Sequence, residues 1–160
     1  IHNIMKWLNS TKRVTAYLAS GWFNPPQEEA RQEMIKVLED NGISYFSPKD
    51  EVEVKFDATH EERQAAFKAD TEVIKHCDFV IASTVNKDMG TLMEMGMAYA
   101  WETPFIVYFP APPGTPCNLM ISESAFAVAQ SPEQLDAIIK RLKETDFDFS
   151  KRYTYEGGIE

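Results

Sequence analysis

Short apolar segments alternate with amphipathic helical segments along most of the chain, and this alternation is the feature that most restricts the fold. The clearest apolar segment, residues 77–83 (CDFVIAS), has the composition of a strand buried on both faces of a parallel sheet. A chain in which strands and helices alternate folds as a parallel sheet with helices on both faces. We therefore expect a single-domain α/β protein of the Rossmann-like or flavodoxin-like type, with about five strands.

The same pattern sets the order of the elements. Asn24, followed by Pro25 and Pro26, is typical of a helix N-terminus, and Gly42 is typical of the residue after a helix. The expected strands span 13–19, 43–46, 77–83, 104–109 and 125–128. The expected helices span 25–41, 60–76, 90–101 and a last segment from 131–132 onward, and 47–59 is expected to be a polar loop. Residues 1–12 are interpreted as an N-terminal extension of a domain that spans 13–160.

Composition excludes several kinds of partner. The chain has 160 residues and a net charge of −9, whereas nucleic acids and anionic membranes require a basic face. No apolar run approaches the ~20 residues of a membrane span. Cys77 and Cys117 form no CxxC pair, which favours a reduced, cytoplasmic protein. A small uncharged ligand is compatible with all of these features.

The patterns of common cofactor and metal sites are also missing from the sequence. Residues 19–22 (ASGW) do not form GxGxxG, and the sequence contains no GK[ST]. The three histidines, His2, His60 and His76, do not have the spacing of metal ligands. We therefore expect neither a metal nor a cofactor.

Glu94 is the most informative residue, because it is the only charged residue in the segment 89–101 (MGTLMEMGMAYAW). A helix that is apolar all round is buried, and an ionised carboxylate inside it is costly unless it is hydrogen-bonded, paired or open to a cavity. Isolated buried acids cluster at functional sites, which favours a catalytic role. The alternative is that Glu94 lies on a narrow exposed stripe or caps a neighbouring element.

Two aspartates accompany Glu94. Asp70 falls on the line of Phe67 and Ile74 along its helix, so it is expected to face inward, either in a site or in an ion pair at the edge of the stripe. Asp88 lies in the loop before the helix of Glu94, and is either a site residue or a solvated or capping aspartate.

Aromatic residues gather at the end of the first expected strand. Tyr17 lies within that strand, where a tyrosine is more often a core residue than a catalytic one. Trp22 and Phe23 follow Gly21 in the turn, where their rings either contact a planar ligand or pack on the first helix. Ligands bind at the carboxyl ends of parallel strands. Acids and aromatic rings at that edge, without a metal or a basic clamp, suit glycosidic chemistry on an uncharged substrate.

Three segments, in the right order, resemble the nucleoside 2-deoxyribosyltransferase family. They are residues 17–23 (YLASGWF), residues 88–98 (DMGTLMEMGMA, a D…GxxxExGxA pattern) and residues 118–120 (NLM). The resemblance implies an enzyme that transfers the 2-deoxyribosyl group of a 2'-deoxynucleoside to a free nucleobase, in nucleoside salvage. It also implies a homo-oligomer, either a hexamer or a dimer.

The resemblance implies catalytic roles for four residues. Glu94 would be the nucleophile that attacks C1' of the deoxyribose, and Tyr17 would hydrogen-bond and orient its carboxylate. Asp70 and Asp88 would contact the base, and one of them would pass a proton to the leaving nitrogen. The sugar would be retained in the β-configuration, because a second base enters from the side that the first one left.

The resemblance also implies substrate-binding residues. The turn that contains Gly21, Trp22 and Phe23 would contact the substrate. Asn118 would bind the 5'-hydroxyl in the site of a neighbouring subunit, and Met120 would line the sugar pocket. A further base contact belongs in the loop after the second strand, at Asp50 or Glu51.

Two other functions stay open. An N-glycosidase of the same architecture would release the base to water, from deoxynucleosides or from their 5'-monophosphates. The loop 110–118 contains no Lys or Arg, which counts against a phosphate. A non-catalytic nucleotide-binding module is the other alternative, but such a module has little use for a lone acid in an apolar helix.

Overall fold

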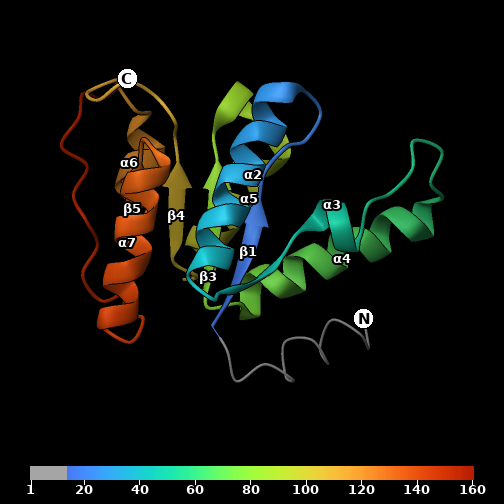
Figure 1. Ribbon diagram of the computed structural model, residues 1–160. Coiled ribbons are helices and arrows are strands. Elements are labelled where there is room, and N and C mark those ends of the chain that lie inside the picture. The colour runs from blue at the N-terminus through green and yellow to red at the C-terminus, as the bar shows by residue number, and fades with distance from the viewer. Residues whose placement is uncertain (1–13) are drawn as a thin grey trace.

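Five parallel strands form one sheet in the order β2-β1-β3-β4-β5 in the computed structural model (Figure 1). The structure describes residues 14–160, so the extension expected at 1–12 lies outside the described residues. The strands are β1 (Thr15–Ala19), β2 (Ser44–Phe46), β3 (Phe79–Ser83), β4 (Phe105–Tyr108) and β5 (Ala127–Ala129). The helices are α2 (Pro25–Asp40), α3 (Pro48–Glu51), α4 (His60–His76), the 3-10 helix η1 (Val85–Lys87), α5 (Met89–Ala100), α6 (Leu119–Ser124) and α7 (Pro132–Glu144).

The strand order is that of flavodoxin-like folds, and it confirms the expected fold class. Helices cover both faces of the sheet. Met34 of α2 and Leu135 of α7 belong to the core on one face, and Ile74 of α4 and Met95 of α5 belong to the core on the other. The sequence pattern succeeds here because each long helix has an apolar stripe to bury.

Strand β1 contributes to both cores, because successive side chains of a strand point to opposite faces of the sheet. Ala16 and Leu18 belong to the core under α2 and α7. Tyr17 and Ala19 belong to the core under α4 and α5. The face covered by α4 and α5 is therefore the one on which Tyr17 can meet acids from those helices.

Two helices occupy segments whose pattern did not predict one. The expected loop 47–59 begins with α3, which starts at a proline. The segment after the proline-rich loop forms α6, where the Asn118 side chain accepts hydrogen bonds from the backbone N–H groups of Met120 (3.0 Å) and Ile121 (3.4 Å). Both helices are short, so they show no apolar period that a sequence pattern could reveal.

The C-terminal tail packs on its own chain. The ring of Phe126 meets Phe149 at 4.9 Å and Tyr153 at 5.3 Å, both edge-on. The backbone N–H of Tyr153 donates to the Phe126 carbonyl at 2.8 Å. Further along, Ile159 pairs with Cys117 in a parallel bridge. The aromatic residues of the tail therefore find their partners within one chain.

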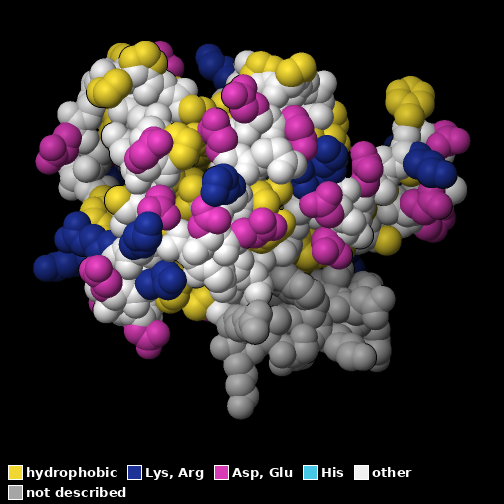
Figure 2. All heavy atoms as spheres, in the orientation of Figure 1, with side chains coloured by type: hydrophobic (Ala, Val, Ile, Leu, Met, Phe, Trp, Pro, Cys, Tyr) yellow, Lys and Arg dark blue, Asp and Glu magenta, His cyan; other side chains and the backbone are white. Residues whose placement is uncertain are grey.

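The acidic side chains that give the chain its net charge of −9 lie on the surface (Figure 2). Acidic side chains are spread over the face shown in Figure 2, and apolar side chains gather at the top of that view, above the ends of the strands. Within residues 14–160, no helix combines the length and the apolar character that crossing a membrane requires.

Candidate active site

Helix α5 carries Glu94, and Asp88 fixes where that helix begins. The Asp88 Oδ2 atom accepts hydrogen bonds from the backbone N–H (2.9 Å) and the hydroxyl (2.8 Å) of Thr91. Asp88 is thus the N-cap of α5, one of the roles expected for it. The cap occupies only one carboxylate oxygen of Asp88, so the other is available to a ligand.

The Glu94 side chain is half-buried and lies near Tyr17, Asp70 and Asp88. Its Oε2 atom is shielded from solvent and has no hydrogen-bond partner among the described residues. Burial raises the pKa of Glu94 to about 8; the Tyr17 hydroxyl opposes this rise, and the charges of Asp70 and Asp88 add to it. Glu94 therefore has a shielded oxygen, although α5 is not buried all round as its apolar sequence predicts, because Met89 and Met93 are exposed.

Tyr17 lies beneath Glu94 in β1. Its side chain is completely buried, and its ring stacks on Phe46 with the ring centroids 5.9 Å apart. The hydroxyl has no partner of standard geometry within residues 14–160, although it lies close enough to Glu94 to stabilise the ionised carboxylate. Burial, followed by the charges of Glu94 and Asp70, raises the pKa of Tyr17 well above its usual value. The hydroxyl therefore keeps its proton and can only donate to a neighbouring carboxylate.

Asp70 of α4 lies near Glu94 and Tyr17. Its Oδ1 atom is shielded and lacks a hydrogen-bond partner in the described part of the chain. Burial raises the pKa of Asp70 to about 7. The ion pair considered for Asp70 does not form with any described residue. Two carboxyl groups with raised pKa values therefore lie close enough for their charges to interact, so protonating one favours ionising the other.

The aromatic turn follows β1, the strand that carries Tyr17. Gly21 is buried, Trp22 is half-buried, and the Phe23 side chain is 72% exposed. The two rings lie 5.0 Å apart at an angle of 32°. Because Phe23 is exposed, the turn presents an apolar surface at the carboxyl end of β1.

Asn118 and Met120 lie apart from the acids within one chain. Asn118 lines a pocket of about 360 Å³ with Leu92 and Lys87, and the Met120 side chain is 73% exposed. Leu92 and Glu94 point to opposite sides of α5, because side chains two residues apart in a helix are rotated by about 200° around its axis. Asn118 therefore faces the side of α5 away from Glu94.

The loop after β2 is held by a buried arginine of α2, Arg31, that the sequence pattern did not single out. Arg31 of α2 is 2% exposed and pairs with Asp50 and with Glu28, and it donates to the Ser47 hydroxyl at 2.8 Å. Asp50 is thus engaged, whereas the Glu51 side chain is exposed. The spacing of α2 could have predicted this burial, because Arg31 precedes the buried Met34 by three residues and lies on the same inward stripe.

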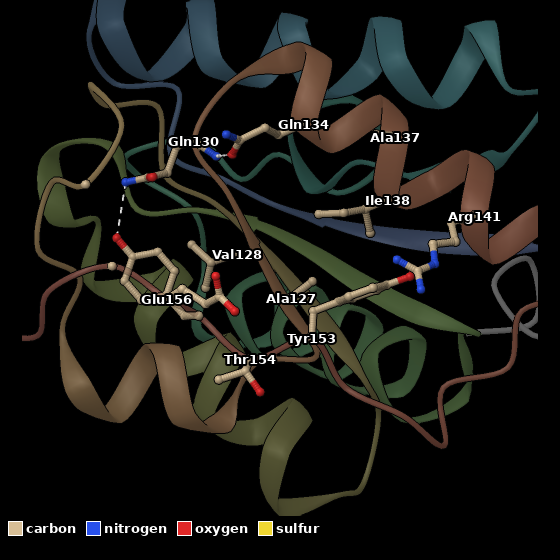
Figure 3. Close-up of a pocket in the computed structure, with 13 residues that line it drawn as sticks. Ala127, Val128, Gln130, Gln134, Ala137, Ile138, Arg141, Tyr153, Thr154 and Glu156 are labelled. Atoms are coloured by element: carbon tan, nitrogen blue, oxygen red, sulfur yellow. Dashed lines mark hydrogen bonds between the residues drawn. The ribbon is translucent and has the colours of Figure 1, made fainter.

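One pocket lies away from the acids. It has a volume of about 530 Å³ and lies between α7 and the tail, where Val128, Ile138 and Tyr153 line it (Figure 3). Gln130 donates to the Tyr155 hydroxyl at its rim. A second pocket, of about 700 Å³, lies between segment 52–58 and α4 and reaches Ala69, the residue before Asp70. The second pocket therefore reaches the helix that carries Asp70.

Comparison with known proteins decides the family. The model of the nucleoside 2-deoxyribosyltransferase family matches residues 16–120. The chain is also similar to a solved 2-deoxyribosyltransferase from the psychrotolerant bacterium Bacillus psychrosaccharolyticus, with 31% identity over 88% of this chain and 99% of that one and a TM-score of 0.69. The chain belongs to the nucleoside 2-deoxyribosyltransferase family. It is therefore an enzyme of the class that acts on the bond between a sugar and a nucleobase.

Two more distant structures share the fold of this family member. A conserved protein from Enterococcus faecalis V583 is 18% identical over 81% of this chain and 98% of its own, with a TM-score of 0.67. The CMP N-glycosidase BcmB of Clostridium botulinum is 17% identical over 79% of this chain and 98% of its own, with a TM-score of 0.52. No curated protein matches the chain.

Burial of Glu94 gives a testable effect on stability. A folded protein whose carboxyl has a pKa of about 8, against 4.5 when unfolded, binds more protons than the unfolded chain between those values. Stability therefore falls as pH rises through this window. We expect Glu94→Gln to remove this dependence, so that its stability relative to the native protein rises between pH 5 and pH 8 by roughly 2 kcal/mol, or roughly 5 °C in Tm.

Thermal unfolding of both proteins across this pH range measures the effect. Glu102→Gln, which changes an exposed glutamate just after the same helix, is the matched control. A constant difference in Tm between Glu94→Gln and the native protein would show that the carboxyl of Glu94 is not destabilised by burial.

Proposed function

We propose that the protein transfers a 2-deoxyribosyl group between nucleobases through a covalent intermediate on Glu94, in cytoplasmic nucleoside salvage. The observation that carries this proposal is the Glu94 carboxyl, whose shielded Oε2 atom has no hydrogen-bond partner within residues 14–160 and which lies near a tyrosine hydroxyl and a second acid. A carboxylate oxygen that is free of hydrogen bonds is available to attack carbon. Membership of the family supplies the substrate class.

The first half of the reaction breaks the bond between sugar and base. A Glu94 oxygen bonds to C1' as the C1'–N bond breaks, and the electron pair of that bond goes to the leaving base. Asp70 donates the proton to that base: its pKa of about 7 keeps much of it protonated near neutral pH, and protonated Asp70 favours the ionised Glu94 that attacks. Asp88 then contacts the base with its uncapped oxygen. The Tyr17 hydroxyl donates to Glu94 and orients it.

The second half reverses these steps with another base. A nitrogen of the incoming base attacks C1', the bond to Glu94 breaks, and the proton of that nitrogen returns to Asp70. Each half inverts C1', so the product keeps the β-configuration. A 2-deoxy sugar favours the reaction, because no electron-withdrawing hydroxyl opposes positive charge at C1'.

Substrate contacts follow from the positions of the remaining residues. The rings of Trp22 and Phe23, which follow the buried Gly21 in the turn, would contact the base. Glu51 is the better of the two candidates for a further base contact, because Asp50 is engaged by Arg31.

Hydrolysis is the second candidate, and one observation favours a version with a 5'-phosphate. Lys87 lines the pocket that contains Asn118, so a cation is available there in addition to the negative charge of Glu160, which lines the same pocket. The loop 110–118 did not reveal this cation, because Lys87 belongs to the segment before α5. Incubation of a deoxynucleoside or its 5'-monophosphate without an acceptor base would reveal this activity.

We expect Glu94→Ala and Glu94→Gln to lower transfer by about four orders of magnitude while the fold is kept, because the covalent step is lost. The measurement is chromatography of a deoxynucleoside incubated with a second base, with Glu102→Gln as the control for a glutamate outside the site. Near-normal turnover in folded Glu94→Ala would refute the assignment of Glu94 as nucleophile.

We also expect a preference for 2'-deoxynucleosides, because the mechanism builds positive charge beside C2'. Adenosine should react at least about tenfold more slowly than deoxyadenosine, a difference of about 1.4 kcal/mol in barrier. Both nucleosides are assayed side by side with the same acceptor base. Equal rates would be incompatible with the proposed sugar specificity.

The proposed enzyme is a homo-oligomer, a hexamer or a dimer, in which one chain completes the site of another. Met89 and Met93 of α5 and Leu119 and Met120 of α6 are exposed apolar side chains. Contiguous apolar surface of this kind is typical of an interface. Asn118 is suited to reach a neighbour, because its Oδ1 is fixed by the α6 cap and its N–H₂ group is left to donate to a 5'-hydroxyl.

Mixing two impaired variants tests the shared site. Glu94→Ala and Asn118→Ala should each be weakly active, and mixed oligomers should regain activity. Some of their sites carry both defects and others carry neither. The assay measures transfer after verified subunit exchange, with each variant alone as the control. No recovery would mean that Asn118 serves the site of its own chain, and a fully active monomer by light scattering would exclude shared sites.

A further inference from the structure

Gln27 is a buried polar residue to which the proposed mechanism gives no role. Its side chain lies in the first turn of α2 and is 4% exposed. The spacing from Asn24 to Gln27 is that of a capping box, in which the glutamine would accept a hydrogen bond from the backbone N–H of the cap residue. The structure differs: the Gln27 Oε1 atom accepts from the backbone N–H of Phe23 at 3.0 Å, one residue before the cap.

The Gln27 amide also occupies the space next to Gly21. A Cβ atom at Gly21 would lie 2.5 Å from Oε1 and 2.8 Å from Nε2 of Gln27, which is closer than real Cβ contacts. The buried glycine of the turn is therefore explained by close packing against Gln27. Gln27 therefore contacts the turn at two points, at Gly21 and at the backbone N–H of Phe23.

The same side chain reaches the loop after β3. Its Nε2 atom donates to the Val85 carbonyl in a long contact of 3.5 Å. A second link runs in parallel, because the Asn86 side chain donates to the Asn24 Oδ1 atom at 2.9 Å. Strands β1 and β3 are neighbours in the sheet, so these bonds join the loops at their carboxyl ends. The second of these loops ends at Asp88, which begins the helix of Glu94.

We propose that Gln27 is a positioning residue that fixes the aromatic turn 20–24 and joins it to the segment that carries Asp88. It sets how tightly the base of the substrate is held between these two loops. This role rests on the proposed function of the turn as the base-binding surface. The bond to Phe23 holds the backbone from which the exposed ring projects, so its loss lets that ring move away from the base.

Gln27→Met tests the role of the hydrogen bonds, because methionine has the same length and no polar group to accept from Phe23. We expect KM for the nucleoside to rise about tenfold, while kcat changes less than about threefold. Gln27→Glu keeps the oxygen that accepts from Phe23 but loses the Nε2 donor to Val85, so it should raise KM less than Gln27→Met does and still speed exchange in 84–88. Gln32→Met, which changes an exposed glutamine of the same helix, is the matched control.

Hydrogen exchange tests the link between the loops independently of any activity. In Gln27→Met, amides of 20–24 and of 84–88 should exchange faster, whereas those of α7 should be unchanged. Should Gln27→Met fail to fold, Gln27→Asn makes the same prediction, because its amide is too short to reach Phe23.

The outcomes separate this inference from the proposed function. A lower Tm with native KM and native exchange in 84–88 would show that Gln27 only caps α2, and would overturn the inference. Absence of any Glu94-dependent transfer or hydrolysis in the native protein would refute the proposed function, and the exchange of the two loops would still decide whether Gln27 joins them.

Discussion

A carboxyl group with one oxygen shielded from water, where β1, α4 and α5 meet, is the constraint on which the rest of the site depends. The shielded Glu94 oxygen has no hydrogen-bond partner within residues 14–160, so the ionised form of Glu94 is unfavourable in the folded chain. Such a group persists only when the surrounding structure holds it in place. The Asp88 cap fixes the start of its helix, and the fully buried Tyr17 fixes the strand beneath it.

The two faces of the sheet differ in what they bury. The face under α2 and α7 is closed by apolar side chains and by the aromatic rings of the tail, which pack around Phe79 and Phe126. The face under α4 and α5 holds the unpartnered polar atoms of Tyr17, Asp70 and Glu94. Stability from the first face therefore allows the second to keep groups that oppose folding, because the same five strands belong to both.

The sequence predicts the parts of this arrangement that depend on periodicity and composition. The strands, the long helices and the isolation of Glu94 in an apolar helix all leave such a signal. Short α3 and α6 leave none, because they are too short to show an apolar period. The ion pair of Arg31 with Asp50 leaves none, because it joins segments that the sequence does not show to be adjacent. The bond from Phe23 to Gln27 is local, but the spacing predicts a capping box with Asn24 in its place. Asn118 is recognisable by its motif, but its place on the far side of α5 from Glu94 follows only from the packing of α6.

Exclusion of water connects the proposed chemistry with the proposed assembly. A covalent sugar on Glu94 reacts with whichever nucleophile reaches it first, so transfer to a base requires that water be kept away. Within one chain Glu94 is only half-buried, and the neighbouring Met89 and Met93 are exposed. A second chain that covers these methionines would shield the intermediate and bring Asn118 to the sugar in the same contact. The balance between transfer and hydrolysis would then depend on the interface as much as on Glu94 itself.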